Sequence, residues 1–246
     1  MILKFSKKQV YHEKYYLKQY NQNYFRIIYC KAVREKGFES DKKQSNIDKT
    51  EEIERVSLSR TKRSIREIAF CNDFNFFATF TINSEVCDRY SLDECQNQLK
   101  KMLKAYKRKN PNFKYLFITE KHKNGAYHFH GLVSGLSDFY VNDNGYLSSK
   151  HWDKLGFNSF SKIKDYNKTC NYITKYISKD CCRNSHNQIY ICSRGLKRPD
   201  VYEIPKIDID WQFENDFVKC KDSYNFTKKE QIAIYNLDID NKKNYV

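Results

Sequence analysis

The chain has 246 residues, of which 40% are hydrophobic, so it can build an ordinary core without disulfide or metal staples. Its 45 Lys and Arg residues against 30 Asp and Glu give a net charge of +15, which suits a polyanionic partner and makes nucleic acid the first candidate. No apolar run approaches the ~20 residues of a membrane span or forms an amino-terminal signal peptide, which excludes a transmembrane protein and favours a cytosolic one.

The first elements with clear signals lie in the first half of the chain. Residues 61–69 carry isoleucines at helical spacing and predict a helix, whereas residues 74–82 are β-branched and aromatic and predict a buried strand. Ser91 is followed three residues later by Glu94, which is the pattern of a helix cap. The apolar stripe after it predicts an amphipathic helix over 91–110.

The second half predicts three more strands and one helix around a hairpin. Residues 113–120 and 126–133 are strand-like segments joined by a short loop, so we expect a β-hairpin. A short strand at 157–160, a helix at 165–180 and a strand at 188–192 follow. Strand, helix, hairpin, helix, strand is an α+β plan with a largely antiparallel sheet.

A His-x-His pair lies on the second arm of the predicted hairpin. His128 and His130 point to the same face of the strand because strand side chains alternate, and two histidines ~7 Å apart can share a divalent ion. The alternative is that both are ordinary half-buried strand residues.

The length of the hairpin loop decides which residue could be the third ligand. A two-residue turn would place Lys121 opposite His128, whereas a three-residue loop over 123–125, with Gly125 in the left-handed conformation, places Glu120 there. We favour the longer loop, which yields a His, His, Glu site suited to Mg²⁺ or Mn²⁺.

The helix over 165–180 repeats the pattern Tyr-Ile-x-Lys with a period of four. One face then presents two phenols, Tyr172 and Tyr176, and two ammonium groups, Lys175 and Lys179. A phenol has a reference pKa of ~10, so a tyrosine nucleophile needs a nearby cation or base. The alternative is a pair of amphipathic aromatics beside solvated lysines. An adjacent apolar stripe is expected to pack this helix on the sheet: Tyr166, Cys170, Ile173 and Ile177.

Three motifs in this order resemble those of the rolling-circle replication initiators of the HUH endonuclease superfamily, in particular the two-tyrosine type of small single-stranded DNA phages and related plasmids. The motifs are Phe77 to Asn83, the pair around Phe129, and Tyr172 to Lys179. The resemblance covers about residues 58–200. It therefore divides the chain into a basic N-terminal extension over 1–57, an origin-nicking domain over 58–200 and a C-terminal extension of unknown role over 201–246.

The resemblance implies a ferredoxin-like or RRM-like central antiparallel sheet with flanking helices, the HUH endonuclease fold. It implies that His128 and His130 bind Mg²⁺ or Mn²⁺ with Glu120 as third ligand. One tyrosine would attack single-stranded origin DNA and leave a 5′-phosphotyrosyl enzyme and a 3′-OH primer, and the other would cut the regenerated origin so that the circle closes. The residues implied in this chemistry are Tyr172, Tyr176, Lys175 and Lys179.

The expected partners are single-stranded origin DNA and, in the cytoplasm of a bacterial host, a host helicase, since the chain holds no G-x-x-x-x-G-K-[ST] motif. Candidate DNA-binding residues are Thr79, Thr81, Arg194, Lys197 and Arg198, with a solvated basic surface as the alternative for the last three. A further cluster is expected to be reduced thiols rather than a zinc site: Cys170, Cys181, Cys182, His186 and Cys192. Rival functions are an RRM-like binder without chemistry, a relaxase and a transposase.

Overall fold

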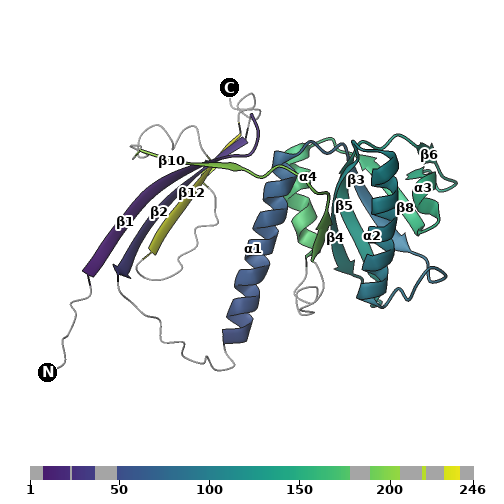
Figure 1. Ribbon diagram of the computed structural model, residues 1–246, viewed down its shortest axis with the longest axis horizontal. Helices are drawn as coiled ribbons and strands as arrows, with labels where there is room; N and C mark the ends of the chain where they lie inside the picture. Colours follow the sequence, from purple (N-terminus) through teal and green to yellow (C-terminus); the bar gives the residue numbers. More distant parts are fainter. Residues whose placement is uncertain are drawn as a thin grey trace. The chain divides into compact units, whose positions relative to one another are not determined.

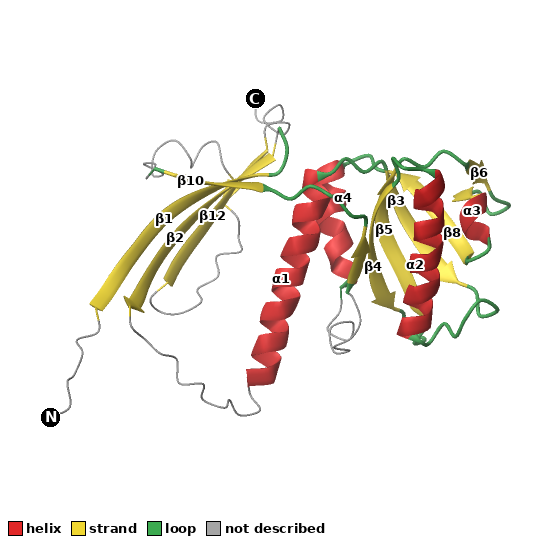
Figure 2. Ribbon diagram, viewed as in Figure 1, coloured by secondary structure: helices red, strands yellow, loops and turns green. Residues whose placement is uncertain are grey.

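The computed structural model describes residues 8–22, 24–36, 49–177, 189–205, 218–219 and 230–238 (Figures 1 and 2). The chain divides into two compact units, Ile47–Lys197 and the pair of flanking segments Met1–Asn46 and Arg198–Val246. No helix in these described ranges is long and apolar enough to span a membrane.

The unit Ile47–Lys197 is built on a five-stranded antiparallel sheet with strand order β8-β3-β5-β4-β9. Its strands are β3 (Phe76–Ile82), β4 (Lys114–Lys121), β5 (Tyr127–Ser134), β8 (Gly156–Lys162) and β9 (Tyr190–Cys192). Its helices are α1 (Lys49–Cys71), α2 (Leu92–Lys109), α3 (Lys150–Asp153) and α4 (Tyr166–Tyr172). The α+β fold with a central antiparallel sheet is as predicted and is consistent with the HUH endonuclease fold.

Helices cover both faces of this sheet, with α2 on one face and α1 and α4 on the other (Figures 1 and 2). Alternation along β3 explains the two layers: Ala78, Phe80 and Ile82 are buried in the core cluster that contains α2, and the residues between them face the other side. Phe80 stacks on Trp152 with ring centroids 4.9 Å apart, and this fully buried tryptophan anchors α3 to the same core.

Helix α2 begins and ends where the sequence predicts. The Ser91 hydroxyl accepts a hydrogen bond from the Glu94 amide, and the Glu94 carboxylate accepts one from the Asp88 amide at 3.0 Å. Helix α1 is longer than the predicted 61–69, because good helix formers continue the pattern upstream. A two-stranded sheet of β6 (Phe139–Val141) and β7 (Leu147–Ser149) lies between β5 and α3 in the chain.

The predicted helix over 165–180 is interrupted. Asp165 caps α4 by accepting a hydrogen bond from the Lys168 amide, but after Tyr172 the chain tightens into the 3-10 helix η1 (Ile173–Tyr176). A β-branched run explains the change, since the Thr174 hydroxyl donates to the Asn171 carbonyl at 2.8 Å and competes with regular helical bonding. The end of the predicted helix, including Lys179, lies outside the described residues.

The flanking segments contain a second five-stranded antiparallel sheet with strand order β10-β1-β2-β12-β11. Its strands are β1 (Lys8–Gln19), β2 (Tyr24–Lys36), β10 (Asp200–Ile204), β11 (Val218–Lys219) and β12 (Glu230–Asp238). The interpretation of 1–57 as an extension did not foresee these strands. The turn between β1 and β2 closes when the Tyr24 amide donates to the Asn21 side chain at 2.8 Å, and its polar sequence hid the pairing.

Candidate active site

The hairpin of β4 and β5 adopts the predicted three-residue loop. The His122 amide donates to the Ala126 carbonyl at 2.8 Å, and Gly125 has a φ of +89°, which favours glycine. Glu120 is consequently the direct partner of His128 across the two strands. The register that places a carboxylate on the histidine face is therefore confirmed.

The Glu120 carboxylate bonds to the second histidine rather than to the one opposite it. Its Oε2 lies 2.7 Å from Nε2 of His130, which is 9% exposed. On the other edge of the ring, Nδ1 of His130 lies 3.2 Å from the Thr79 hydroxyl. A neutral His130 that donates from Nε2 to the carboxylate must accept at Nδ1, so the threonine hydroxyl donates there.

His128 is held on one side only. Its Nδ1 lies 3.1 Å from the Thr81 hydroxyl, whereas its buried Nε2 has no hydrogen-bond partner in the described structure. The ring of His122 stacks on it with centroids 4.9 Å apart. A buried nitrogen without a partner is costly in a finished core, and it leaves a lone pair or a proton available to a ligand.

The two tyrosines lie over the same face of the sheet. The Tyr176 hydroxyl donates to the Tyr172 hydroxyl at 2.7 Å, and the Tyr176 ring stacks on His130 with centroids 3.8 Å apart. Phe77 from β3 lies about 6 Å from all three rings: its centroid distances are 5.9 Å to His130, 6.0 Å to Tyr172 and 6.1 Å to Tyr176. The predicted phenol pair and the predicted histidine pair thus form one cluster.

Tyr166 fixes the start of α4 and so positions the tyrosines. Its hydroxyl donates to the carbonyls of Ala69 and Asn72 at the end of α1 and accepts from the Phe74 amide at 3.3 Å. Burial raises its pKa, so the phenol stays protonated. The rest of the predicted apolar stripe is buried, as expected: Cys170, Ile173 and Ile177.

The site favours neutral side chains. Burial lowers the pKa of His130 more than the bond to Glu120 raises it, and burial with the nearby His122 lowers the pKa of His128. Burial, the hydrogen bond to Tyr172 and the Glu120 charge raise the pKa of Tyr176. Neutral imidazole is the form that binds metal ions.

The donor set can be tested against a metal ion on these contacts. In the part of the chain that the structure describes, no group of three or more His, Cys, Asp or Glu side chains is arranged to hold a metal. Glu120 instead bonds directly to His130. The residue types nevertheless fit: both Nδ1 atoms are held by threonines, which leaves the Nε2 atoms as ligand positions, and the Nε2 of His128 has no other described partner.

The remaining predicted site residues are dispersed. Lys175 lies over the ring of Tyr172, with Nζ 5.0 Å from the centroid, and its ammonium is a cation–π partner there. The Lys197 backbone is tied to the Asn72 side chain near the end of α1. Arg194 lines a cavity beside α2, and Arg198 belongs to the flanking unit.

Sequence reasoning missed Phe77 and the positioning role of the threonines. Phe77 was part of the first motif, but nothing in its spacing indicated a contact with His130 and Tyr176, which lie far along the chain. Thr79 and Thr81 alternate with it on the same face of β3 and pair across the strand with His130 and His128, so the period of two was the available signal.

A His-x-His strand at the middle of an antiparallel sheet, with two tyrosines stacked above it, defines an α+β domain of the HUH type. Residues 75–181 match the family model described as replication-associated protein ORF2, which is consistent with a rolling-circle, Rep-type replication initiator. This segment contains all three motifs and confirms the predicted resemblance. No curated protein and no solved structure gives a significant match to the chain.

Proposed function

We propose that the protein initiates rolling-circle replication by nicking single-stranded origin DNA through a tyrosine and rejoining strands afterwards. The observation that carries the proposal is the hydroxyl pair of Tyr172 and Tyr176, stacked directly on His130 within the matched segment. An RRM-like binder would use exposed aromatics for stacking and has no need for a phenol pair joined to a buried histidine and carboxylate.

Tyr172 is the better first nucleophile of the two. It is 43% exposed, so a phosphodiester can reach it, whereas Tyr176 is covered by the rings around it. Tyr172 also accepts the hydrogen bond from Tyr176, and this donation stabilises a phenolate at Tyr172. The Lys175 ammonium above its ring favours the same charge.

The nicking step balances as a phosphoryl transfer. The Tyr172 oxygen forms a bond to phosphorus as the bond from phosphorus to the 3′ oxygen breaks, which leaves a 5′-phosphotyrosine and a 3′-hydroxyl. The phenol proton is released to solvent, and the leaving oxygen takes up a proton. Attack on the phosphotyrosine by a later 3′-hydroxyl reverses the step and joins the strands.

A divalent cation would be held by Nε2 of His128 and His130 with the Glu120 carboxylate, and it would polarise the scissile phosphate. For both Nε2 atoms to bind it, each ring must carry its proton on Nδ1. Thr79 and Thr81 can accept that hydrogen bond, because a hydroxyl is both donor and acceptor. The threonines therefore hold the rings in either protonation pattern.

The test is a covalent one. Wild type, Tyr172→Phe, Tyr176→Phe and the double variant are incubated with a labelled single strand carrying the replicon's own origin, with Mn²⁺ or with EDTA. We expect a denaturant-resistant adduct that needs the metal, falls most in Tyr172→Phe and is lost in the double variant. Tyr146→Phe, an exposed tyrosine of the small sheet, is the matched control and should keep wild-type adduct.

Two outcomes would contradict the proposal. Tight origin binding with no adduct under any metal condition would replace it with the non-catalytic binder. An adduct that survives in the double variant would assign the nucleophile elsewhere.

A further inference from the structure

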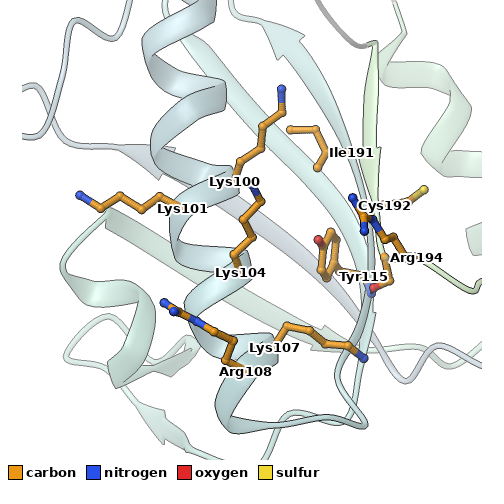
Figure 3. Close-up of a pocket in the computed structure, with 10 residues that line it drawn as sticks. Lys100, Lys101, Lys104, Lys107, Arg108, Tyr115, Ile191, Cys192 and Arg194 are labelled. Atoms are coloured by element: carbon orange, nitrogen blue, oxygen red, sulfur yellow. The ribbon is translucent and has the colours of Figure 1, made fainter.

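A basic cavity lies on the face of the sheet opposite the tyrosines. It has a volume of about 900 Å³ and is formed between α2 and the edge of the sheet at β4 and β9 (Figure 3). Tyr115 lies at its centre and alternates with the strand positions that lead to Glu120, so the two side chains leave β4 on opposite faces. The cavity is thus separate from the proposed nicking site.

Six cationic side chains line this cavity, and no Asp or Glu is among its described lining residues. We call this set the basic groove: Lys100, Lys101, Lys104, Lys107, Arg108 and Arg194. Five of them follow one side of α2 over two turns, about 12 Å of helix. The sixth comes from the segment after β9 and reaches the same cavity (Figure 3).

Only part of this charge is used by the fold. The Lys107 ammonium donates to the carbonyls of Pro111 and Phe113 and ties down the end of α2, and Lys100 donates to the Gln96 side chain. The other four cations have no hydrogen bond or ion pair to any residue that the structure describes: Lys101, Lys104, Arg108 and Arg194. Like charges gathered this closely destabilise the fold unless an anion neutralises them.

The dimensions favour an extended polyanion over a single phosphate. Cations spaced four residues apart on a helix are ~6 Å apart along its axis, and they continue over both turns. In the view of Figure 3, Tyr115 lies between Lys104 and Arg194, which places an aromatic ring among the charges. A cationic trough with an aromatic ring is typical of surfaces that follow a nucleic-acid backbone.

We propose that the basic groove binds the sugar–phosphate backbone of DNA at a second place, apart from the strand presented to Tyr172. The inference rests on the proposed function only in naming DNA as the polyanion. DNA held there would be a stretch that flanks the nick site, either single-stranded or duplex, because both present the same phosphates.

The test is the salt dependence of binding by the Lys104→Gln/Arg194→Gln variant. Fluorescence anisotropy is measured between 50 and 200 mM salt in EDTA, with a labelled single strand and with its duplex as separate probes. Loss of two phosphate contacts should lower the salt slope by about 1.4 for a single strand or about 1.8 for a duplex. Over this fourfold range the wild type then loses about 7 to 12 times more affinity than the variant.

Lys150→Gln/Lys154→Gln is the matched control, because it removes the same charge beside a different cavity that contains Asp138. It should keep the wild-type slope. The probe whose slope changes identifies single-stranded or duplex DNA as the ligand. If the first variant does not fold, Lys101→Gln/Arg108→Gln tests the same groove from side chains on the outer side of α2.

An unchanged slope in a folded groove variant, or an equal change in the control, would overturn the proposal. Since the measurement involves no cleavage, it can fail while the adduct experiment succeeds, and the reverse also holds.

Discussion

The Glu120 carboxylate lies 2.7 Å from Nε2 of His130, although the strand register places Glu120 directly opposite His128. The diagonal bond is possible because residues two apart on one strand share a face and lie within reach of a long side chain. His130 is consequently held at both ring nitrogens, whereas His128 is held at Nδ1 alone. The two histidines therefore differ in how readily each can take a ligand.

Replacing Glu120 should weaken metal use more than folding. Glu120→Gln keeps a hydrogen-bonding group beside His130 but removes the negative charge that a cation needs. We expect adduct formation to require roughly tenfold more Mn²⁺ or more, with partial recovery at high metal. The measurement is adduct yield against Mn²⁺ concentration, with the exposed Asp143→Asn as control. A wild-type titration curve would show that Glu120 does not serve the metal.

The threonine of the half-held histidine should act as a positioning residue. Thr81→Val removes the bond to Nδ1 of His128 and should cost about 1 kcal/mol of unfolding free energy. It should also raise the Mn²⁺ requirement for adduct formation by about tenfold. Thr81→Ser restores the hydroxyl and should restore the metal response. Equal titration curves for the valine and serine variants would reject the role.

The strand that carries the histidines should not tolerate a side chain at Gly131. A Cβ there would lie 2.3 Å from the Phe117 ring, in a fully buried part of the core. Gly131→Ala should lower the unfolding free energy by about 1 to 3 kcal/mol, measured by urea unfolding. A variant as stable as the wild type would mean that Phe117 moves aside without loss.

Two buried thiols should resist alkylation in the native protein. Burial raises the pKa of Cys95 and of Cys170 to about 12, so at pH 8 almost none of either is the reactive thiolate. Iodoacetamide followed by peptide mass mapping should leave both unmodified until urea is added. Modification of either under native conditions would contradict this. The cysteines whose side chains are described are free thiols, as expected: Cys71, Cys87, Cys95, Cys170 and Cys192.

Local chemistry made part of the site predictable. The loop over 123–125 could be chosen because a left-handed Gly125 has a short-range cause, and the strand register follows from it. Alternation then placed the histidines and a carboxylate on one face. The contact of Glu120 with His130 depends on a side-chain rotamer, and rotamers are set by the surrounding packing.

Long-range pairing was beyond the reach of the sequence pattern. The basic groove needs β9 beside β4, so that Arg194 joins a stripe on α2 that lies far earlier in the chain. The second sheet pairs β2 with β12, and its strands alternate aromatic with polar residues too weakly to be recognised alone. In both places the partner strand, and not the local propensity, determines the structure.

The second sheet joins segments from opposite ends of the chain, since Tyr24 of β2 pairs with Asp238 of β12 and the whole unit Ile47–Lys197 lies between them. On the ribosome, where residues are added at ~5–20 per second, β2 is complete roughly 10 to 40 s before its neighbour β12 has been made. The unit Ile47–Lys197 has all of its strands during that interval and can fold first. The sheet of the flanking unit must close last, and until then the hairpin of β1 and β2 presents an open strand edge that other chains can pair with.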